Sequence, residues 1–254
     1  MQKIDSARKA GQVVTANQYP YTASKTSLIA AIVPRWAENG GLETLRQRIE
    51  DPSLKNRIEA EITENIRRRG GPSSLVLTNV KDSSLHFRSL EEIAIDMKLS
   101  PSQTTMRLIE SGESPGVVSH NMKEADVIYF MQQPWVMTGS DGGSSHPRKN
   151  SSFTRKIRKY VMEEKVLSLA EMIRLSTSLM AEVLGIVERG KIAEGYFADI
   201  LLFDPKTITD KATFEAPGLY SEGVQYVWVN GELTIDQAKY TEVLAGRALR
   251  KEQK

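Results

Sequence analysis

Apolar positions along the chain follow two different periods, which predict both helices and strands. Ile58, Ile62 and Ile66 recur at helical spacing, so residues 55–69 are expected to form a helix. The pair Asp51-Pro52 marks its start, because proline is favoured in the first turn of a helix. Short apolar runs that end in turn residues are expected to be strands, and they lie at residues 13–16, 74–80, 126–130 and 135–138.

The other expected helices lie mostly between residues 28 and 115, where residues 89–97 and 100–111 form a pair of short ones. At the start of the chain, residues 3–10 are expected to end a helix at Gly11. Residues 168–184 have the pattern of one long amphipathic helix.

The pattern changes after Gly185. Residues 224–229 alternate with period two, and Asn230-Gly231 follows directly. An Asn-Gly pair between alternating segments is the strongest short signal for a β-hairpin. The chain is therefore expected to end in a small β unit.

Composition limits the classes of function. The chain has 254 residues, of which 40% are hydrophobic and 26% charged, a balance typical of folded globular proteins. A net charge of +2 gives no reason to expect a nucleic-acid partner, and no apolar run reaches the roughly 18 residues of a membrane span. The first residues lack the apolar segment of a secretion signal, so the compartment stays unknown. Without cysteine, and with three histidines outside any HxH or HExxH motif, the chain shows no complete zinc site.

The candidate chemistry gathers where an apolar run ends in Gly139-Ser140-Asp141. This boundary places Asp141 at the carboxyl end of an expected strand, which is where α/β barrels collect catalytic groups. His146 and Arg148 follow within eight residues. The segment therefore joins an acid, a titratable ring and a guanidinium that can hold a carboxylate through two parallel N–H bonds.

Each of these residues also has a plainer interpretation. Asp141 could bond its own backbone in a turn, and Arg148 could face solvent in a basic loop. His146 could orient Asp141, contact a substrate, or cap the loop before Pro147. Tyr19 and Ser24 carry hydroxyls that can bond a substrate carboxylate or carbonyl, or they could serve packing around a rigid Tyr-Pro turn.

A series of short motifs in a fixed order gives the chain a family resemblance. The motifs are residues 19–24 (YPYTAS), 135–142 (WVMTGSDG), 146–148 (HPR), 189–190 (RG), 195 (G), 198–199 (AD), 203–205 (FDP), 229–231 (VNG) and 246–247 (GR). In this order they resemble the carboxyl-terminal half of the N-acyl-D-amino-acid deacylases, the D-aminoacylase group of the amidohydrolase superfamily.

The resemblance implies an α/β fold. It would consist of a partial (β/α)₈ amidohydrolase barrel, represented by its last strands near Val13 and Val136, with a helical insertion at about residues 28–115. A small carboxyl-terminal β-sandwich portion would follow. The implied division is a barrel part at residues 1–184 and a sandwich part with the tail at residues 185–254.

The resemblance also implies a reaction, the metal-dependent hydrolysis of the amide bond in N-acyl-D-amino acids. Asp141 would be the catalytic residue and a candidate metal ligand, because a carboxylate beside a bound metal can take and return a proton. Arg148, Tyr19, Ser24 and His146 would bind the substrate. Zinc or another divalent metal would serve the complete enzyme. Its main ligands are expected outside this chain, so the chain alone is expected to be inactive.

Two alternatives come from other classes of protein. Residues 89–111 have the pattern of a helix–turn–helix DNA-binding motif, although Arg107 is the second helix's sole cation and Glu110 lies nearby. We interpret them as a helical hairpin over an active-site mouth. The chain could also be a non-catalytic interaction remnant, or half of a split enzyme with an upstream partner chain, since an incomplete barrel leaves open strand edges.

Overall fold

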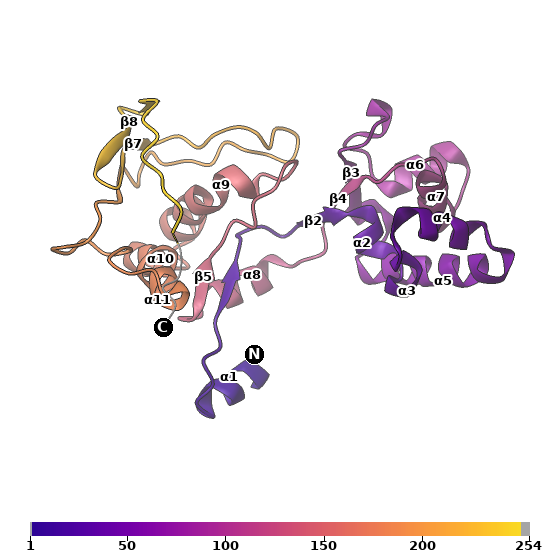
Figure 1. The fold of residues 1–254 in the computed structure, drawn as a ribbon, viewed down its shortest axis with the longest axis horizontal. Helices are drawn as coiled ribbons and strands as arrows, with labels where there is room; N and C mark the ends of the chain where they lie inside the picture. The colour runs from indigo at the N-terminus through magenta and orange to yellow at the C-terminus, as the bar shows by residue number, and fades with distance from the viewer. Residues whose placement is uncertain (1, 250–254) are drawn as a thin grey trace. The chain divides into compact units, whose positions relative to one another are not determined.

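The computed structural model describes residues 2–249, which divide into two compact units. One unit combines residues 2–21 with residues 125–249, and the other comprises residues 22–124 (Figure 1). The second unit begins before residue 28 and ends after residue 115, because strands at both of its ends belong to its sheet. Each unit is described by itself.

The first unit contains a pair of parallel strands, β1 (Ala16–Gln18) and β5 (Val136–Thr138). Ala16 pairs with Val136 and Gln18 with Thr138. The strand predicted at residues 135–138 is confirmed as β5, but the strand predicted at residues 13–16 lies further along the chain. Val13 is 92% exposed and lies outside the ladder, so its apolar character does not mark a buried strand.

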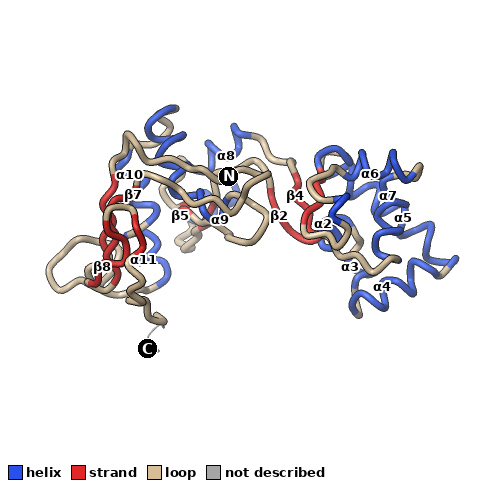
Figure 2. The backbone as a smooth tube through the Cα atoms, turned by 90° about the horizontal axis from the view of Figure 1, so that it is seen from above, coloured by secondary structure: helices blue, strands red, loops and turns tan. Residues whose placement is uncertain are grey.

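Helices accompany this pair in the first unit, and Figure 2 shows them in blue. Helix α1 (Gln2–Lys9) is confirmed, but residues 126–130 belong to helix α8 and not to a strand. The cause is visible in the burial, since Val127 and Met131 lie four residues apart and both enter the core. The remaining helices of this unit are α8 (Glu124–Met131), α9 (Arg148–Arg155), a π-helix (Lys156–Glu163), α10 (Leu169–Ser176) and α11 (Ser178–Leu184).

The long helix predicted at residues 168–184 is in fact two helices. Thr177, with φ of −131° and ψ of −83°, separates α10 from α11 and takes the backbone out of the helical region. Ser168 caps the start of α10 through a capping box with Glu171. One face of α10 joins the core through Met172 and Leu175.

The small β unit predicted at the end of the chain is confirmed as an antiparallel sheet of order β6-β7-β8-β9. Asn230 and Gly231, with φ of 52° and 86°, make the turn between β7 and β8, as the sequence predicted. The strands are β6 (Ile200–Phe203), β7 (Val224–Val229), β8 (Glu232–Asp236) and β9 (Lys239–Tyr240).

The second unit packs helices around a three-stranded antiparallel sheet of order β2-β4-β3. Its core is built from aliphatic side chains, among them Leu28, Ile58, Ile62, Leu77 and Val117. The helices predicted at residues 55–69, 89–97 and 100–111 and the strand at residues 74–80 are confirmed. Its elements are β2 (Ser24–Ser27), α2 (Leu28–Ile32), α3 (Arg35–Glu38), α4 (Gly41–Glu50), α5 (Pro52–Arg68), β3 (Leu75–Thr78), α6 (Leu90–Met97), α7 (Pro101–Glu110) and β4 (Gly116–Ser119), with short 3₁₀ turns at Pro72–Ser74 and Ser83–Leu85.

A membrane-crossing helix is not found among residues 2–249, since none is both long and apolar enough to span a bilayer.

Candidate active site

Asp141 lies in the turn that follows β5, three residues after Thr138. Gly139 still donates its N–H to the carbonyl of Gln18 at 3.0 Å, which ties the start of the turn to β1. Asp141 itself has φ of +44°, in the left-handed region where aspartate is tolerated better than most residues. Its side chain is 66% exposed. The turn therefore presents a carboxylate at the carboxyl end of the parallel strand pair.

Arg148 begins helix α9 and is 4% exposed. Its Nη2 lies 2.7 Å from Oδ2 of Asp141, so the acid and the guanidinium form an ion pair. Its Nε and Nη1 are buried and find no hydrogen-bond partner among residues 2–249. The Cζ atom lies 4.4 Å from the centre of the Tyr19 ring, a cation–π contact that partly replaces the lost hydration. Arg148 is thus a buried, incompletely paired cation.

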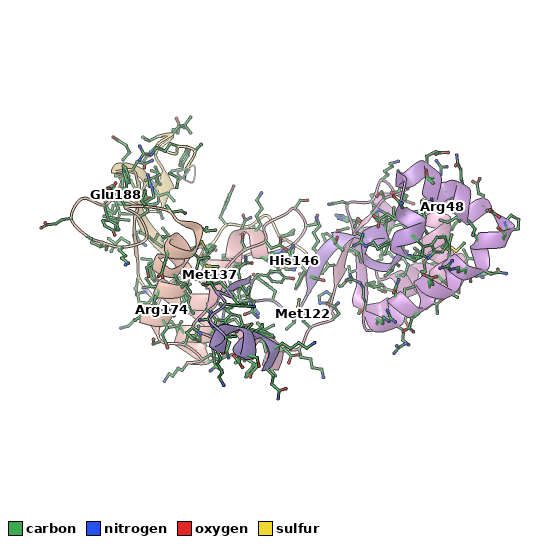
Figure 3. The ribbon with its side chains drawn as sticks, turned by 60° about the horizontal axis from the view of Figure 1, so that its bottom comes forward. Arg48, Met122, Met137, His146, Arg174 and Glu188 are labelled. Atoms are coloured by element: carbon green, nitrogen blue, oxygen red, sulfur yellow. The ribbon has the colours of Figure 1, made fainter. Side chains whose placement is uncertain are left out.

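His146 is completely buried in the same unit (Figure 3). Its Nδ1 accepts the backbone N–H of Arg148 at 3.0 Å. Three rings meet the imidazole edge-on, with centroid distances of 5.0 Å for Phe214, 5.3 Å for Tyr21 and 6.0 Å for Tyr19. The ring thus supports the first residue of α9.

Tyr19 and Tyr21 both remain neutral phenols over the physiological range. Burial raises the pKa of Tyr19, and the positive charge of Arg148 offsets part of that rise. Burial likewise raises the pKa of Tyr21 to about 12. Tyr21 is the more buried of the two and packs against His146, while Tyr19 lies against Arg148.

Of the five site residues predicted from the sequence, the structure brings Asp141, Arg148, Tyr19 and His146 together in one unit. Ser24 belongs to the other unit, where it is the first residue of β2 and pairs with Ser119 of β4. Its predicted contact with substrate stays a prediction.

Lys156 is a buried group near this site that the sequence analysis did not single out. The residue is 1% exposed, and its Nζ donates to Oγ1 of Thr138, the last residue of β5, at 2.8 Å. Ser176 of α10 donates to the same hydroxyl at 2.8 Å. Burial lowers the pKa of Lys156 to about 8. Lys156 lies in a run of basic residues, and such a run is typical of an exposed surface. In the structure Lys156 is the first residue of the π-helix, and its side chain is buried.

The described residues do not form a metal centre. Nowhere in residues 2–249 do three or more histidine, aspartate or glutamate side chains gather closely enough to hold an ion. Asp141 is committed to Arg148, and Nδ1 of His146 is committed to a backbone N–H. The described residues therefore do not fit a resident zinc ion.

Comparison with known proteins places this site in a family. Residues 130–235, which include Asp141, His146 and Arg148, match the model of the amidohydrolase family. The chain is 37% identical over 153 residues to an N-acyl-D-aspartate deacylase of Alcaligenes xylosoxydans xylosoxydans, covering 59% of this chain and 30% of that protein. It is 31% identical over 253 residues to an N-acyl-D-glutamate deacylase of the same organism, covering 98% of this chain and 44% of that protein. This chain is a relative of the N-acyl-D-amino-acid deacylases.

Solved structures of such deacylases share its fold. The N-acyl-D-glutamate deacylase of Bordetella bronchiseptica, complexed with zinc and a phosphonate inhibitor, matches with a TM-score of 0.70 at 29% identity, over 92% of this chain and 42% of that one. A crystal structure of D-aminoacylase matches with a TM-score of 0.73 at 28% identity, over 96% of this chain and 44% of that one. The chain thus spans less than half the length of the relatives it matches. An α/β composition with a small antiparallel sheet is confirmed.

The helix–turn–helix alternative finds no support in the described residues. Helices α6 and α7 do pack against each other, but Arg107 lies 3.7 Å from Glu110, which offsets its charge. A duplex-binding helix needs several cations free to contact phosphates.

Proposed function

We propose that this chain supplies the carboxylate-binding part of an N-acyl-D-amino-acid deacylase and is inactive by itself. The observation that carries the proposal is the buried guanidinium of Arg148, which forms an ion pair with Asp141 in the turn after β5 and leaves Nε and Nη1 without a hydrogen-bond partner among residues 2–249. N-acyl amino acids carry a free carboxylate, and a guanidinium binds a carboxylate through charge-assisted N–H bonds.

The geometry links binding of the substrate carboxylate to the release of Asp141 from its ion pair with Arg148. The Nε and Nη1 atoms of Arg148 are inaccessible, so an arriving carboxylate reaches the guanidinium at Nη2, where Asp141 lies. Two carboxylates cannot share that position without strong repulsion. The substrate carboxylate therefore replaces Asp141 at Arg148, and Asp141 becomes available for proton transfer. Its exposed position on a turn allows this movement.

Asp141 then serves as base and acid in the same turnover. Its carboxylate takes a proton from water, and the water oxygen forms a bond to the acyl carbon. The carbon–nitrogen bond breaks, and Asp141 returns the proton to the departing amine. The products are a carboxylic acid and a free D-amino acid. The relatives of known structure contain zinc or copper, and the described residues of this chain do not fit such an ion. We expect hydrolysis to require a metal-binding segment that they do not include.

A binding experiment tests the role of Arg148 without requiring turnover. Isothermal titration calorimetry would compare N-acetyl-D-glutamate with its α-amide, which lacks the α-carboxylate. Asp141→Asn removes the competing charge and keeps a residue that tolerates a positive φ, so this variant should bind the acid more tightly than the wild type does. Arg148→Met should abolish binding. Lys149→Met removes a neighbouring exposed charge and should leave binding unchanged.

Two outcomes would count against the proposal. If Asp141→Asn binds the acid no better than the α-amide, Arg148 is not a carboxylate receptor. If the purified chain with added zinc hydrolyses N-acetyl-D-glutamate, the chain holds its own metal site and is not merely one part of the enzyme.

A further inference from the structure

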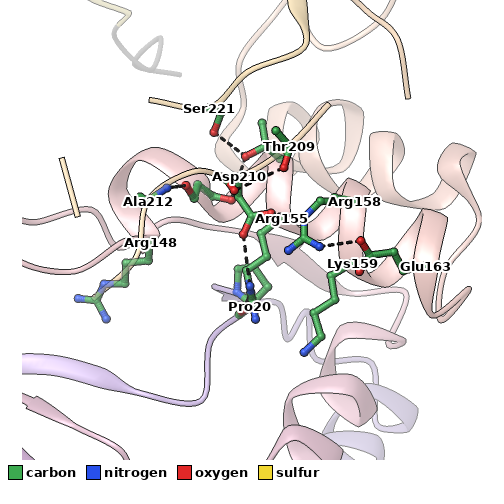
Figure 4. Close-up of polar contacts among 12 residues, drawn as sticks. Pro20, Arg148, Arg155, Arg158, Lys159, Glu163, Thr209, Asp210, Ala212 and Ser221 are labelled. Atoms are coloured by element: carbon green, nitrogen blue, oxygen red, sulfur yellow. Dashed lines mark hydrogen bonds and ion pairs between the residues drawn. The ribbon is translucent and has the colours of Figure 1, made fainter. Parts of the chain in front are cut away.

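The segment between β6 and β7 runs along helix α9, whose first residue is Arg148 (Figure 4). We call residues 207–223 the strap. Four hydrogen bonds, each with at least one side-chain partner, join it to Asn150, Ser151 and Thr154 of α9. They join Ala212 N to Ser151 Oγ at 3.3 Å, Asn150 Nδ2 to the Pro217 carbonyl at 3.2 Å, Ser221 Oγ to the Asn150 carbonyl at 2.8 Å, and Thr154 Oγ1 to Ser221 Oγ at 2.7 Å.

The two ends of the strap are joined to each other. Thr209 and Glu222 exchange backbone N–H···O bonds of 3.0 Å in both directions. Gly223 follows with φ of +94°, and a Cβ atom there would lie 2.4 Å from Cα of Ile208. That distance leaves no room for a side chain. The strap is therefore a closed loop with a fixed neck.

Asp210 anchors this loop with a buried charge. Its side chain is 5% exposed and lies between two arginines, with Oδ1 2.5 Å from Nε of Arg158 and Oδ2 3.3 Å from Nη1 of Arg155. Arg155 also donates through Nε to the carbonyl of Pro20 at 3.0 Å. One carboxylate thus links the strap to α9, to the π-helix and to the segment after β1.

The same network reaches the residue that supports Arg148. Phe214 of the strap meets His146 edge-on at 5.0 Å, and Arg155 lies over the ring of Tyr21, which also contacts His146. Nδ1 of His146 in turn accepts the backbone N–H of Arg148.

We propose that the strap is a positioning element for the carboxylate receptor, in which Asp210 and Phe214 act on Arg148 through Arg155 and His146. The inference rests on the proposed function, because Arg148 must be that receptor. Asp210 is a positioning residue and not a catalytic one, since its carboxylate is fully engaged by Arg155 and Arg158.

Variants of the full chain test this positioning role through binding. We expect Asp210→Asn and Phe214→Leu, each made in the Asp141→Asn background, to weaken binding of N-acetyl-D-glutamate about tenfold, because small displacements of positioned groups have large effects. Asp204→Asn removes an exposed carboxylate that precedes the strap, and it should leave the dissociation constant unchanged. A urea titration of each variant would establish that more than about 99% is folded at the temperature of the calorimetry. That check separates lost positioning from lost stability.

The outcomes separate this inference from the proposed function. If the Asp141→Asn parent binds and Arg148→Met abolishes binding, but folded Asp210→Asn and Phe214→Leu both bind as tightly as the parent, the positioning role is wrong and the receptor stands. If the parent does not bind, the proposed function itself fails. Phe214→Leu changes side-chain volume little, so it decides the question if Asp210→Asn does not fold.

Discussion

Replacing Lys156 by methionine should stabilise the first unit below pH 8. The amine is buried, and among residues 2–249 its hydrogen-bond partner is a threonine hydroxyl rather than a carboxylate. Elements that pack against the π-helix carry charged residues such as Arg155, Glu171 and Arg174, but burial alone accounts for the lowered pKa. Methionine has a similar shape and no charge, and Thr138 keeps its bond from Ser176.

The magnitude follows from the pKa of Lys156, which falls from 10.5 in the unfolded chain to about 8 in the folded one. The unfolded state then binds more protons between pH 8 and pH 10.5, so stability rises with pH across that window. At pH 7 the charged amine costs about 3 kcal/mol, at pH 9 about 2 kcal/mol and at pH 10 about 1 kcal/mol. Loss of one hydrogen bond to Thr138 offsets about 1 kcal/mol at every pH.

Urea unfolding at 25 °C from pH 7 to pH 10 measures this difference. The Trp36→Phe background leaves Trp135 and Trp228, which both report on the first unit. The free energy of unfolding of Lys156→Met should exceed that of the parent by about 2 kcal/mol at pH 7, and the difference should vanish near pH 10. Lys149→Met, which removes an exposed charge, should show neither effect. A stability difference for Lys156→Met that does not change with pH would refute the reasoning, because a buried ammonium must titrate.

Three further predictions concern other parts of the chain. Ser89→Ala removes the hydroxyl that accepts the backbone N–H of Glu92 and donates to its carboxylate, and it should lower the stability of the second unit by about 1 kcal/mol, measured by Trp36 fluorescence during urea unfolding. Ile62→Ala creates a cavity in the same unit and should cost about 2–5 kcal/mol in the same measurement. The raised pKa of Tyr21 contributes stability that is fully present below pH 10 and lost as the pH rises through about 12, so Tyr21→Phe should flatten the stability profile between those values.

The sequence predicted the parts of the fold that depend on local signals. Proline at the start of α5 and the Asn230-Gly231 turn act through the backbone of a few residues, and both elements formed as expected. Residues 126–130 show the limit of such signals, because a short apolar run fits a buried strand and a helix equally well. Only the packing of Val127 and Met131 into one core decides between them.

The candidate site divides in the same way. Asp141, His146 and Arg148 lie within eight residues, so their proximity was predictable from one strand end and one turn. Asp210 and Phe214 lie more than sixty residues later in a segment without regular structure, and no local pattern connects them to Arg148. The sequence also allowed Arg148 to face solvent. That alternative is wrong, because the side chain of Arg148 in α9 is buried.

Arg148 and Asp141 differ in burial, and this difference supports a different role for each of them. Arg148 is buried, and its helix is held by the strap, so its guanidinium has little freedom to move. Asp141 is exposed on a turn and contacts the site through one ion pair. A receptor that fixes a substrate must be rigid, because any motion costs orientation, whereas a proton carrier must move between a water and a leaving amine. If Arg148 had to move during the reaction, the hydrogen bonds that hold α9 to the strap would resist that movement. The structure therefore favours a fixed Arg148 that binds the substrate and a mobile Asp141 that carries the proton.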